Sequence, residues 1–283
     1  MSDKSKSIIF MLASALSFTL MTVSIRYSGD LPIVEKLWFR NLVSLFITFW
    51  ILRQGRFSLF GKPENRKFLI LRAFLGITGM SLFFYTIEYL HLTDASILSK
   101  LSPFYVTLFA TLFLGEKIKR YQIPALIIVF SAAMLVVKPK FDLSILPALA
   151  GFVGAAAAGG AYTLVRYLNK TEKPATIIFV FSIVSIIILT PPTLYFYQIP
   201  DLVQLLFLLL TGVFAASGQF GLTFAYRFSP ATEVSFYSYF QILFAAAADF
   251  IFWGEVSDTY SIIGGVIIIM VSLFIFLKNR KTL

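Results

Sequence analysis

Long apolar segments, each followed by a short polar connection, make up almost the whole chain. A helix that crosses a membrane needs roughly 20 mostly apolar residues. Backbone groups cannot stay unpaired in hydrocarbon, so segments this apolar must be helices rather than open strands. The pattern predicts ten transmembrane helices, at residues 7–27, 33–53, 67–89, 93–114, 119–138, 144–166, 174–197, 202–226, 231–253 and 258–277.

A Gly-Glu pair closes two of these segments, Gly115-Glu116 after the fourth and Gly254-Glu255 after the ninth, at an offset of 139 residues (255 − 116). A fixed internal period defines a repeating unit, here of five segments. An odd number of crossings places the second copy upside down, and inverted repeats are typical of transporters. We therefore expect an all-α integral membrane protein built from two inverted five-helix repeats, residues 1–140 and 141–283. The same offset aligns Gly79/Gly218, Thr93/Thr232, Ser96/Ser235, Ser99/Ser238, Tyr121/Tyr260 and Ile123/Ile262.

The composition agrees with a membrane protein. Apolar residues make up 58% of the chain and charged residues 13%, whereas soluble domains average about 45–50% and 25%. There is no Cys, and His91 is the only His, so the sequence excludes a thiol nucleophile and a multi-His metal site. No P-loop motif is present to bind ATP. We expect a protein that is not an enzyme and that holds no cofactor and no metal.

Basic residues account for the net charge of +10 and concentrate on one side of the predicted membrane. With the N-terminus in the cytoplasm, 17 of the 24 Lys and Arg residues fall on cytoplasmic connections or termini. By the positive-inside rule, both termini face the cytoplasm of a multi-pass cell-membrane protein. This bias explains the charge without nucleic acid as a partner, and membrane lipid is the expected neighbour. The four residues on the opposite side are Arg26, Lys36, Lys138 and Lys140.

Further motifs lie within the segments: Phe39-Arg40-Asn41 in the second, Arg72 near the start of the third and Leu101-Ser102-Pro103 in the fourth. Together with the two Gly-Glu pairs, this pattern resembles the EamA-type members of the drug/metabolite transporter superfamily over nearly the whole chain. The resemblance implies a central cavity lined mainly by helices 1, 3, 4, 6, 8 and 9, with helices 5 and 10 at the periphery. It implies small organic substrates such as amino acids, nucleotide-related metabolites, organic acids or cationic drugs.

The second half departs from this pattern at the centre. Ile242 stands where a second Pro103 would be, and Phe181 or Ser182 stands where a second Arg40 would be. We therefore expect two halves that are chemically unequal around the cavity.

Ionisable side chains within a membrane span are costly and usually mark a functional site or an ion pair. Arg40 and Lys100 each lie about seven residues inside their predicted helices, roughly 10 Å from the outer boundary. At the repeat offset Lys100 corresponds to Tyr239, so these two residues are expected to face each other. Three interpretations of Lys100 stay open. It binds a carboxylate or phosphate of the substrate, it pairs with Asp249 or Glu88, or it snorkels outward.

The other charged candidates are Arg40, Arg72, Asp249 and Glu88. Arg40 presents a guanidinium that suits a substrate carboxylate, or it serves helix packing. Arg72 lies at the predicted cytoplasmic edge, where we expect it to snorkel to headgroups or cap a loop. Asp249 and Glu88 are the candidate coupling or gating groups, because burial raises the pKa of a carboxyl and a neighbouring cation lowers it.

Uncharged polar side chains complete the predicted site. Gln219, Gln241 and Asn41 are costly to expose to lipid and are expected to face the interior, where they bind substrate or tie helices together. Glu116 and Glu255 are expected to make structural contacts between helices. An aromatic cavity suits a partly apolar organic solute. The aromatic candidates are Tyr85, Phe104, Tyr162 and Tyr239.

These features predict a secondary transporter that works by alternating access, with a proton or an exchanged solute as coupling partner. Two intramembrane cations favour a solute with a negative group, such as an amino acid or an organic acid. One alternative is a proton-coupled exporter of cationic or amphiphilic drugs, which would need an exposed central carboxylate. A passive channel is the alternative outside this class.

Overall fold

The computed structural model describes residues 3–90, 95, 98–118, 120–121, 123–125, 127–128, 131–132, 146–256 and 259–280. Within these residues the chain forms helices joined by short connections, without strands. The helices of the first half are α1 (Asp3–Tyr27), α2 (Ile33–Gln54), η1 (Pro63–Asn65), α3 (Arg66–Tyr89) and α5 (Ser102–Leu114). Those of the second half are α7 (Leu146–Leu168), α8 (Pro174–Phe196), α9 (Leu202–Phe228), α10 (Ala231–Val234), η3 (Ser235–Tyr239), α11 (Phe240–Trp253) and α12 (Thr259–Arg280).

Six helical stretches of the described residues are long and apolar enough to cross a membrane: Asp3–Tyr27, Pro63–Tyr89, Leu146–Leu168, Pro174–Phe196, Leu202–Phe228 and Ser235–Trp253. Large apolar side chains cover the outside of the bundle. Phe113 is 75% exposed, Leu194 is 73% exposed and Leu202 is 86% exposed. Apolar surface this extensive marks a membrane-facing protein, in agreement with the predicted all-α membrane fold.

Two predicted helices differ in the structure, and a third cannot be compared. The ninth segment, 231–253, is not one α-helix but α10, η3 and α11 in succession, because the Ser and aromatic residues of η3 are weak helix formers. In the fourth segment α5 begins only at Ser102, where Pro103 occupies the first turn, the helical position that tolerates a missing N–H. Most of the fifth segment, 119–138, lies outside the described residues.

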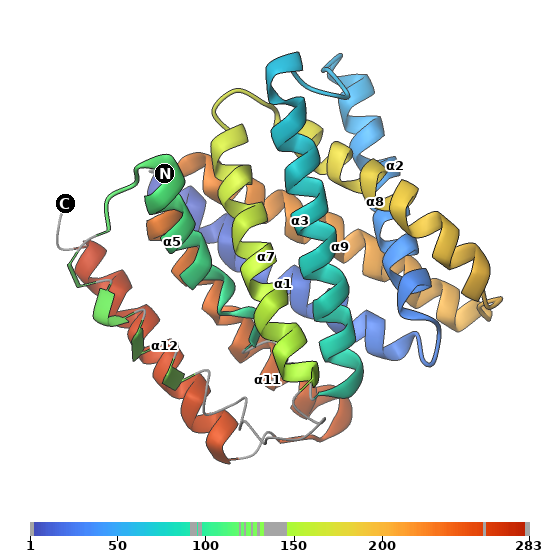
Figure 1. Cartoon of the computed structure of the whole chain (residues 1–283). Coiled ribbons are helices and arrows are strands. Elements are labelled where there is room, and N and C mark those ends of the chain that lie inside the picture. Colours follow the sequence, from blue (N-terminus) through green and yellow to red (C-terminus); the bar gives the residue numbers. More distant parts are fainter. Residues whose placement is uncertain are drawn as a thin grey trace.

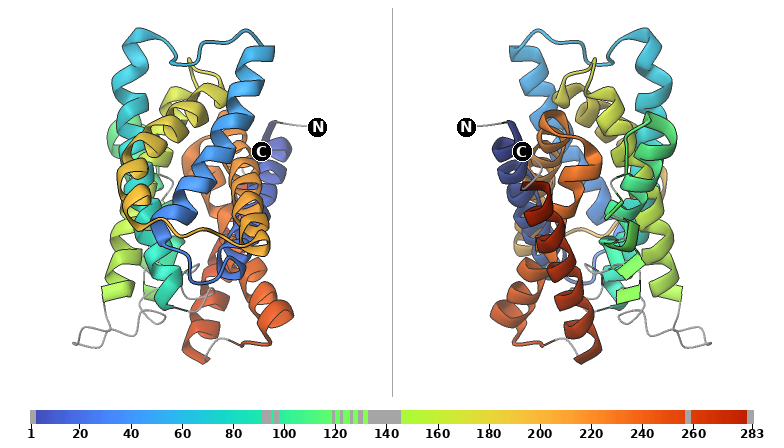
Figure 2. Two further views of the ribbon diagram at one scale, coloured as in Figure 1. Left: turned by 90° about the vertical axis from the view of Figure 1, so that its right-hand side faces the viewer. Right: turned by 90° about the vertical axis from the view of Figure 1, so that its left-hand side faces the viewer.

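Helices from the two halves pack against each other in pairs. α1 packs along α9, α3 along α7 and α2 along α8 (Figure 1). Smaller contacts join α2 to α9 and α3 to α8, and α7 to α5 and α1 to α11. Figure 2 shows the α2–α3 connection at one end of the bundle, and the end of α11 with the start of α12 at the other. The space between the halves therefore runs through the middle of the bundle.

Small residues allow the paired helices to approach closely. A Cβ atom on Gly79 of α3 would lie 2.9 Å from the backbone nitrogen of Ala158 and 2.9 Å from the carbonyl oxygen of Gly154, both on α7. A Cβ atom on Gly221 of α9 would lie 2.8 Å from the carbonyl oxygen of Phe10 on α1. Both pairs of helices thus meet backbone to backbone.

The two Gly-Glu motifs form the same cap. α5 ends at Gly115 with φ 67° and α11 ends at Gly254 with φ 65°, the left-handed conformation that glycine adopts at helix C-termini. The next residue turns its backbone N–H back to the helix, from Glu116 to the Ala110 carbonyl and from Glu255 to the Asp249 carbonyl, at 3.2 Å in each case. Each cap therefore fixes the direction in which a glutamate leaves its helix.

Candidate functional site

A central cavity lies between the two halves, with an empty volume of about 990 Å³ that includes space open to solvent. α1, α3, α7, α9, α11 and the residues around the start of α5 contribute to its wall, as the family resemblance implies. α2 and α8 contribute as well, through Arg40 and Phe181. Among the described residues of the wall, three are cationic and none is acidic. The charged and polar members are Ser14, Arg40, Arg72, Ser99, Lys100, Ser102, Tyr162, Gln219, Tyr226, Ser238 and Gln241.

Lys100 lies in the turn before α5 and is 6% exposed. Its Nζ donates a hydrogen bond of 2.6 Å to Oε1 of Gln241 on α11. The carboxylates named as its candidate partners pair with other cations instead: Asp249 with Arg26, and Glu88 with Lys36 at 3.7 Å. A lysine this buried does not snorkel outward. In the part of the chain that the structure describes, its contact is therefore a neutral amide at the cavity wall.

Arg40 and Arg72 both lie on the ring of Phe181 from α8. The guanidinium carbon is 5.5 Å from the ring centre for Arg40 and 4.0 Å for Arg72, distances at which a cation attracts an aromatic face. Arg40 Nη1 donates to the side-chain oxygen of Asn41 at 3.0 Å, and Arg72 Nη2 donates to Oε1 of Gln219 at 3.0 Å. These neighbours are neutral, so none of these contacts supplies a counter-charge to the two guanidinium groups.

The expectation for Arg72 was wrong. It is 1% exposed and lines the cavity, so it neither snorkels to headgroups nor caps a loop. Its position six residues after the start of α3 places it about 9 Å along the helix, which is far enough inside to reach Phe181. The sequence did carry a signal, because Arg72 is an ionisable residue within an apolar segment. We missed it because the segment was predicted to begin at residue 67, which placed Arg72 at the edge of the membrane.

The chain matches the EamA-like transporter family over residues 5–138 and again over residues 145–277. The protein belongs to the EamA-like transporter family. It is 33% identical over 270 residues to the pseudopaline exporter CntI of Pseudomonas aeruginosa, with 94% of each chain covered. It is 26% identical over 279 residues to an S-adenosylmethionine uptake transporter of Rickettsia bellii, with 96% of this chain and 94% of the other covered.

A riboflavin transporter of Brucella anthropi is 24% identical over 295 residues, with 96% of this chain and 99% of the other covered. A crystal structure at 12% identity superposes with a TM-score of 0.79 over 98% of this chain and 99% of the other, and this likeness concerns the fold alone. Family and relatives identify a multi-pass membrane transporter of small metabolites rather than an enzyme.

In this EamA-like protein the predicted polar and aromatic residues divide into two sets. Tyr162, Gln219 and Gln241 line the cavity beside Lys100 and Arg40. The others lie outside the described cavity wall: Asn41 is buried against Arg40, Tyr85 packs on Tyr89 with ring centres 4.8 Å apart, and Phe104 and Tyr239 belong to an apolar cluster with Phe236. Tyr239 is thus not part of this wall, and the residue of the second half that contacts Lys100 is Gln241 of α11.

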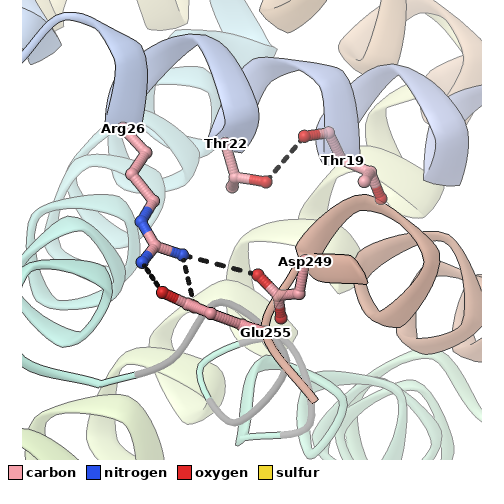
Figure 3. Close-up of polar contacts among 5 residues, drawn as sticks. All are labelled: Thr19, Thr22, Arg26, Asp249 and Glu255. Atoms are coloured by element: carbon pink, nitrogen blue, oxygen red, sulfur yellow. Dashed lines mark hydrogen bonds and ion pairs between the residues drawn. The ribbon is translucent and has the colours of Figure 1, made fainter. Parts of the chain in front are cut away.

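The candidate gating group Asp249 lies in a cluster at the end of α1 (Figure 3). Arg26 Nη1 is 3.6 Å from Oδ1 of Asp249, which is 2% exposed. The same guanidinium donates two hydrogen bonds to Glu255, at 2.9 and 2.6 Å, and lies 4.3 Å from the ring centre of Trp253. α1 is thus tied to the end of α11 by a two-pronged ion pair.

A matching pair ties α7 to the end of α5. Arg166 Nε donates to Oε1 of Glu116 at 3.1 Å, and Arg166 Nη1 donates to the carbonyl oxygen of Tyr226 at 2.8 Å. Both glutamates of the Gly-Glu motifs therefore make contacts between helices, as expected from the sequence.

Proposed function

We propose that the protein is a secondary transporter that moves a small organic solute bearing a carboxylate or another anionic group. The observation that carries this proposal is the charge of the cavity: Arg40, Arg72 and Lys100 line it, and the described wall holds no acid. A buried charge without a counter-charge costs several kcal/mol. An anion bound between these residues supplies the missing counter-charge.

The relatives support a small organic cargo, since their names specify pseudopaline, S-adenosylmethionine and riboflavin. Among the classes that the cavity charge favours are amino acids and organic acids. The apolar and aromatic part of the wall suits the carbon skeleton of such a solute.

We further propose that the halves are inverted repeats that rock about the cavity and expose it to each side in turn. Two features support this arrangement. Exchanging the halves converts the α1–α9 packing into the α7–α3 packing, and both are present. The same exchange converts the Arg26–Glu255 pair into the Arg166–Glu116 pair, and both are formed.

The proposed orientation has both termini in the cytoplasm of the cell membrane, on the strength of the distribution of Lys and Arg in the sequence. A proton or an exchanged solute is the proposed coupling partner. Asp249 and Glu88 sit in ion pairs away from the described cavity wall, an arrangement that favours a gating role over contact with the solute.

The alternative of a cationic drug exporter would need a carboxylate in the cavity, and the described wall offers none. A channel differs from a carrier in its kinetics, because only a carrier exchanges labelled solute against unlabelled solute at a saturable site.

The test is thermal stabilisation of the purified protein by a panel of carboxylates, amino acids, phosphorylated metabolites and organic cations. A ligand that binds only the folded state raises the melting temperature. We expect stabilisation by anions that is lost in Lys100→Ala and kept in Lys36→Ala, a control cation that pairs with Glu88 outside the cavity. Stabilisation by cations alone, unchanged in Lys100→Ala, would overturn the proposal.

A further inference from the structure

The three cavity cations form two groups with different protein partners. Arg40 and Arg72 share the Phe181 ring, and Arg72 reaches Gln219 on α9; we name this pair the arginine pole. Lys100 reaches Gln241 on α11 and is named the lysine pole. One cavity thus holds two positive groups that face different helices of the second half.

The arginine pole has unused hydrogen-bonding capacity. Nε of Arg40, and Nε and Nη1 of Arg72, are buried and find no hydrogen-bond partner among the residues that the structure describes. A buried donor left unsatisfied costs roughly 1–3 kcal/mol, more for a charged group. A carboxylate that displaces the neutral Gln219 amide would accept from the guanidinium fork in the two-pronged geometry such forks favour. The arginine pole can therefore bind an anionic group of the solute.

The lysine pole has capacity as well. An ammonium group carries three donors, and Lys100 gives one of them to Gln241 at 2.6 Å. An anionic group at this pole would receive a charge-assisted hydrogen bond while the glutamine keeps its own.

The rest of the wall combines apolar or small residues with the hydroxyl groups of Ser14, Ser99, Ser102, Tyr162, Tyr226 and Ser238. Ala15, Phe18, Gly76, Met80 and Ala155 belong to it. The apolar residues offer van der Waals contact to a hydrocarbon chain. The cavity is thus cationic at two places, with apolar surface and uncharged hydroxyl groups elsewhere.

We propose that the substrate carries at least two anionic groups, as in a dicarboxylate or larger polycarboxylate, with one group at the arginine pole and another at the lysine pole. This inference rests on the proposed function. A monocarboxylate compensates one pole and leaves the other as it was. Recognition by both poles selects for the number of anionic groups and for the length of chain between them.

The test compares monocarboxylates and dicarboxylates of equal carbon number, namely pentanoate with glutarate, heptanoate with pimelate and nonanoate with azelate. Apparent affinities come from thermal stabilisation of the purified protein in detergent. We expect at least one dicarboxylate to bind about tenfold or more tightly than its matched monocarboxylate, the effect of one added charged hydrogen bond. Lys100→Met should abolish this preference, and the control Lys36→Met should keep it.

The wild-type comparison needs no variant, so a misfolded mutant leaves the test intact. Equal or weaker binding of every dicarboxylate overturns the two-pole inference, and anion transport stands if the monocarboxylates still bind. Stabilisation by pentyltrimethylammonium with none by either series overturns both. A dicarboxylate preference that survives in a folded Lys100→Met protein also overturns the assignment of the second pole.

The two Arg–Glu pairs carry a second, independent inference. Each glutamate leaves a left-handed Gly cap and is held by an arginine from the last turn of a helix in the other half: Arg26 of α1 holds Glu255, and Arg166 of α7 holds Glu116. The ends of α5 and α11 lie at opposite ends of the bundle (Figure 1). An Arg–Glu pair therefore joins the two halves at each end of the bundle.

We infer that these pairs are the two latches of the transport cycle, each released when its own end of the cavity opens. Each pair joins residues of different halves across the space that must widen at that end. Both pairs are partly exposed, with arginine side chains 33% exposed at Arg26 and 20% at Arg166. A partly exposed ion pair is weak enough to break and re-form in every cycle.

The absence of native cysteine makes single-cysteine labelling a direct test. Met80 packs against the cluster that holds Ile25, next to Arg26, so M80C reports on that part of the cavity wall. Met11 belongs to the cluster that holds Val165, next to Arg166, so M11C reports on the other part. We expect Arg26→Gln to raise the rate of maleimide labelling at M80C about two- to fivefold, the effect of losing a partly exposed ion pair, and to lower it at M11C. Arg166→Gln should do the reverse, and the swap R166E/E116R should restore the wild-type rates.

Opposite shifts at the two cysteines distinguish a latch from general loosening, which would raise both rates. Parallel changes at M80C and M11C, or no change in either arginine variant, would overturn the inference.

Discussion

Replacing Gly79 by alanine tests whether the two halves meet backbone to backbone. The added Cβ atom would lie 2.9 Å from the Ala158 nitrogen and from the Gly154 oxygen. Neither atom belongs to a side chain, so neither can rotate away. α3 and α7 must separate by about 0.5 Å before the contact reaches the ordinary range, which begins at 3.4 Å.

The magnitude follows from the size of this overlap. Added atoms in a well-packed interior cost about 1–3 kcal/mol, and a backbone obstacle places Gly79→Ala near the middle or top of that range. We expect a loss of about 2 kcal/mol, or a fall in melting temperature of about 4–8 °C. The loss should also slow transport, because α3 and α7 both line the cavity.

The measurement is the melting temperature of the purified variant, followed by intrinsic tryptophan fluorescence. Two matched variants calibrate it. Gly218→Ala, at the repeat-related position, meets the Phe18 ring at 2.7 Å, a side chain that can move, so its cost should be smaller. Among the described residues, Gly265→Ala meets Ile242 alone, at the ordinary contact distance of 3.5 Å, and should melt as the wild type does. A Gly79→Ala protein as stable as Gly265→Ala would refute the close approach of α3 and α7.

Three further predictions concern the ends of the helices. Glu172→Ala should destabilise the protein by about 2–3 kcal/mol in a melting experiment. The reason is that the buried Glu172 carboxylate accepts hydrogen bonds from the Lys62 backbone N–H at 2.9 Å and from the Asn65 side-chain amide at 2.6 Å. The control Glu64→Ala, at an exposed residue, should have no measurable effect. Asp201→Ala should lower the free energy of unfolding by about 1 kcal/mol in the same assay, since it removes the capping box of α9. Asn169 lies in an Asn-Lys-Thr sequon but should carry no glycan in a glycosylating host, because it is 8% exposed and its side chain donates a hydrogen bond to the Thr223 carbonyl. Glycosidase treatment should therefore leave the mobility of the protein on a gel unchanged.

The apolar pattern predicted most of the fold because lipid leaves the backbone few choices. The predicted starts at residues 33, 174 and 202 match those of α2, α8 and α9, where Pro or a polar residue precedes or opens the helix. The break at Ser235–Tyr239 escaped prediction, since an apolar count registers length and does not register a local change to 3₁₀ geometry.

Two of the three cavity cations, Arg40 and Lys100, were predicted as site residues, but Arg72 and the partners of these side chains were not. Lys100 and Arg40 were found because a cation in an apolar segment stands out. The pairing of Lys100 with Gln241, and of Asp249 with Arg26, depends on how helices far apart in the sequence rotate against each other. Phe181 was noted only as a departure from the repeat, and its contact with two guanidinium groups became visible in three dimensions.

Arg40, Arg72 and Lys100 all belong to the first half, whereas the second half contributes the uncharged Gln219 and Gln241. In the cycle that we propose, a solute held by charge would stay with the first half while the second half moves past it. A charge that crosses the whole membrane field changes in energy by about 2.3 kcal/mol per 100 mV. A bound dianion would cancel two of the three positive charges, so in the proposed cycle membrane voltage would act mainly on the return of the empty carrier.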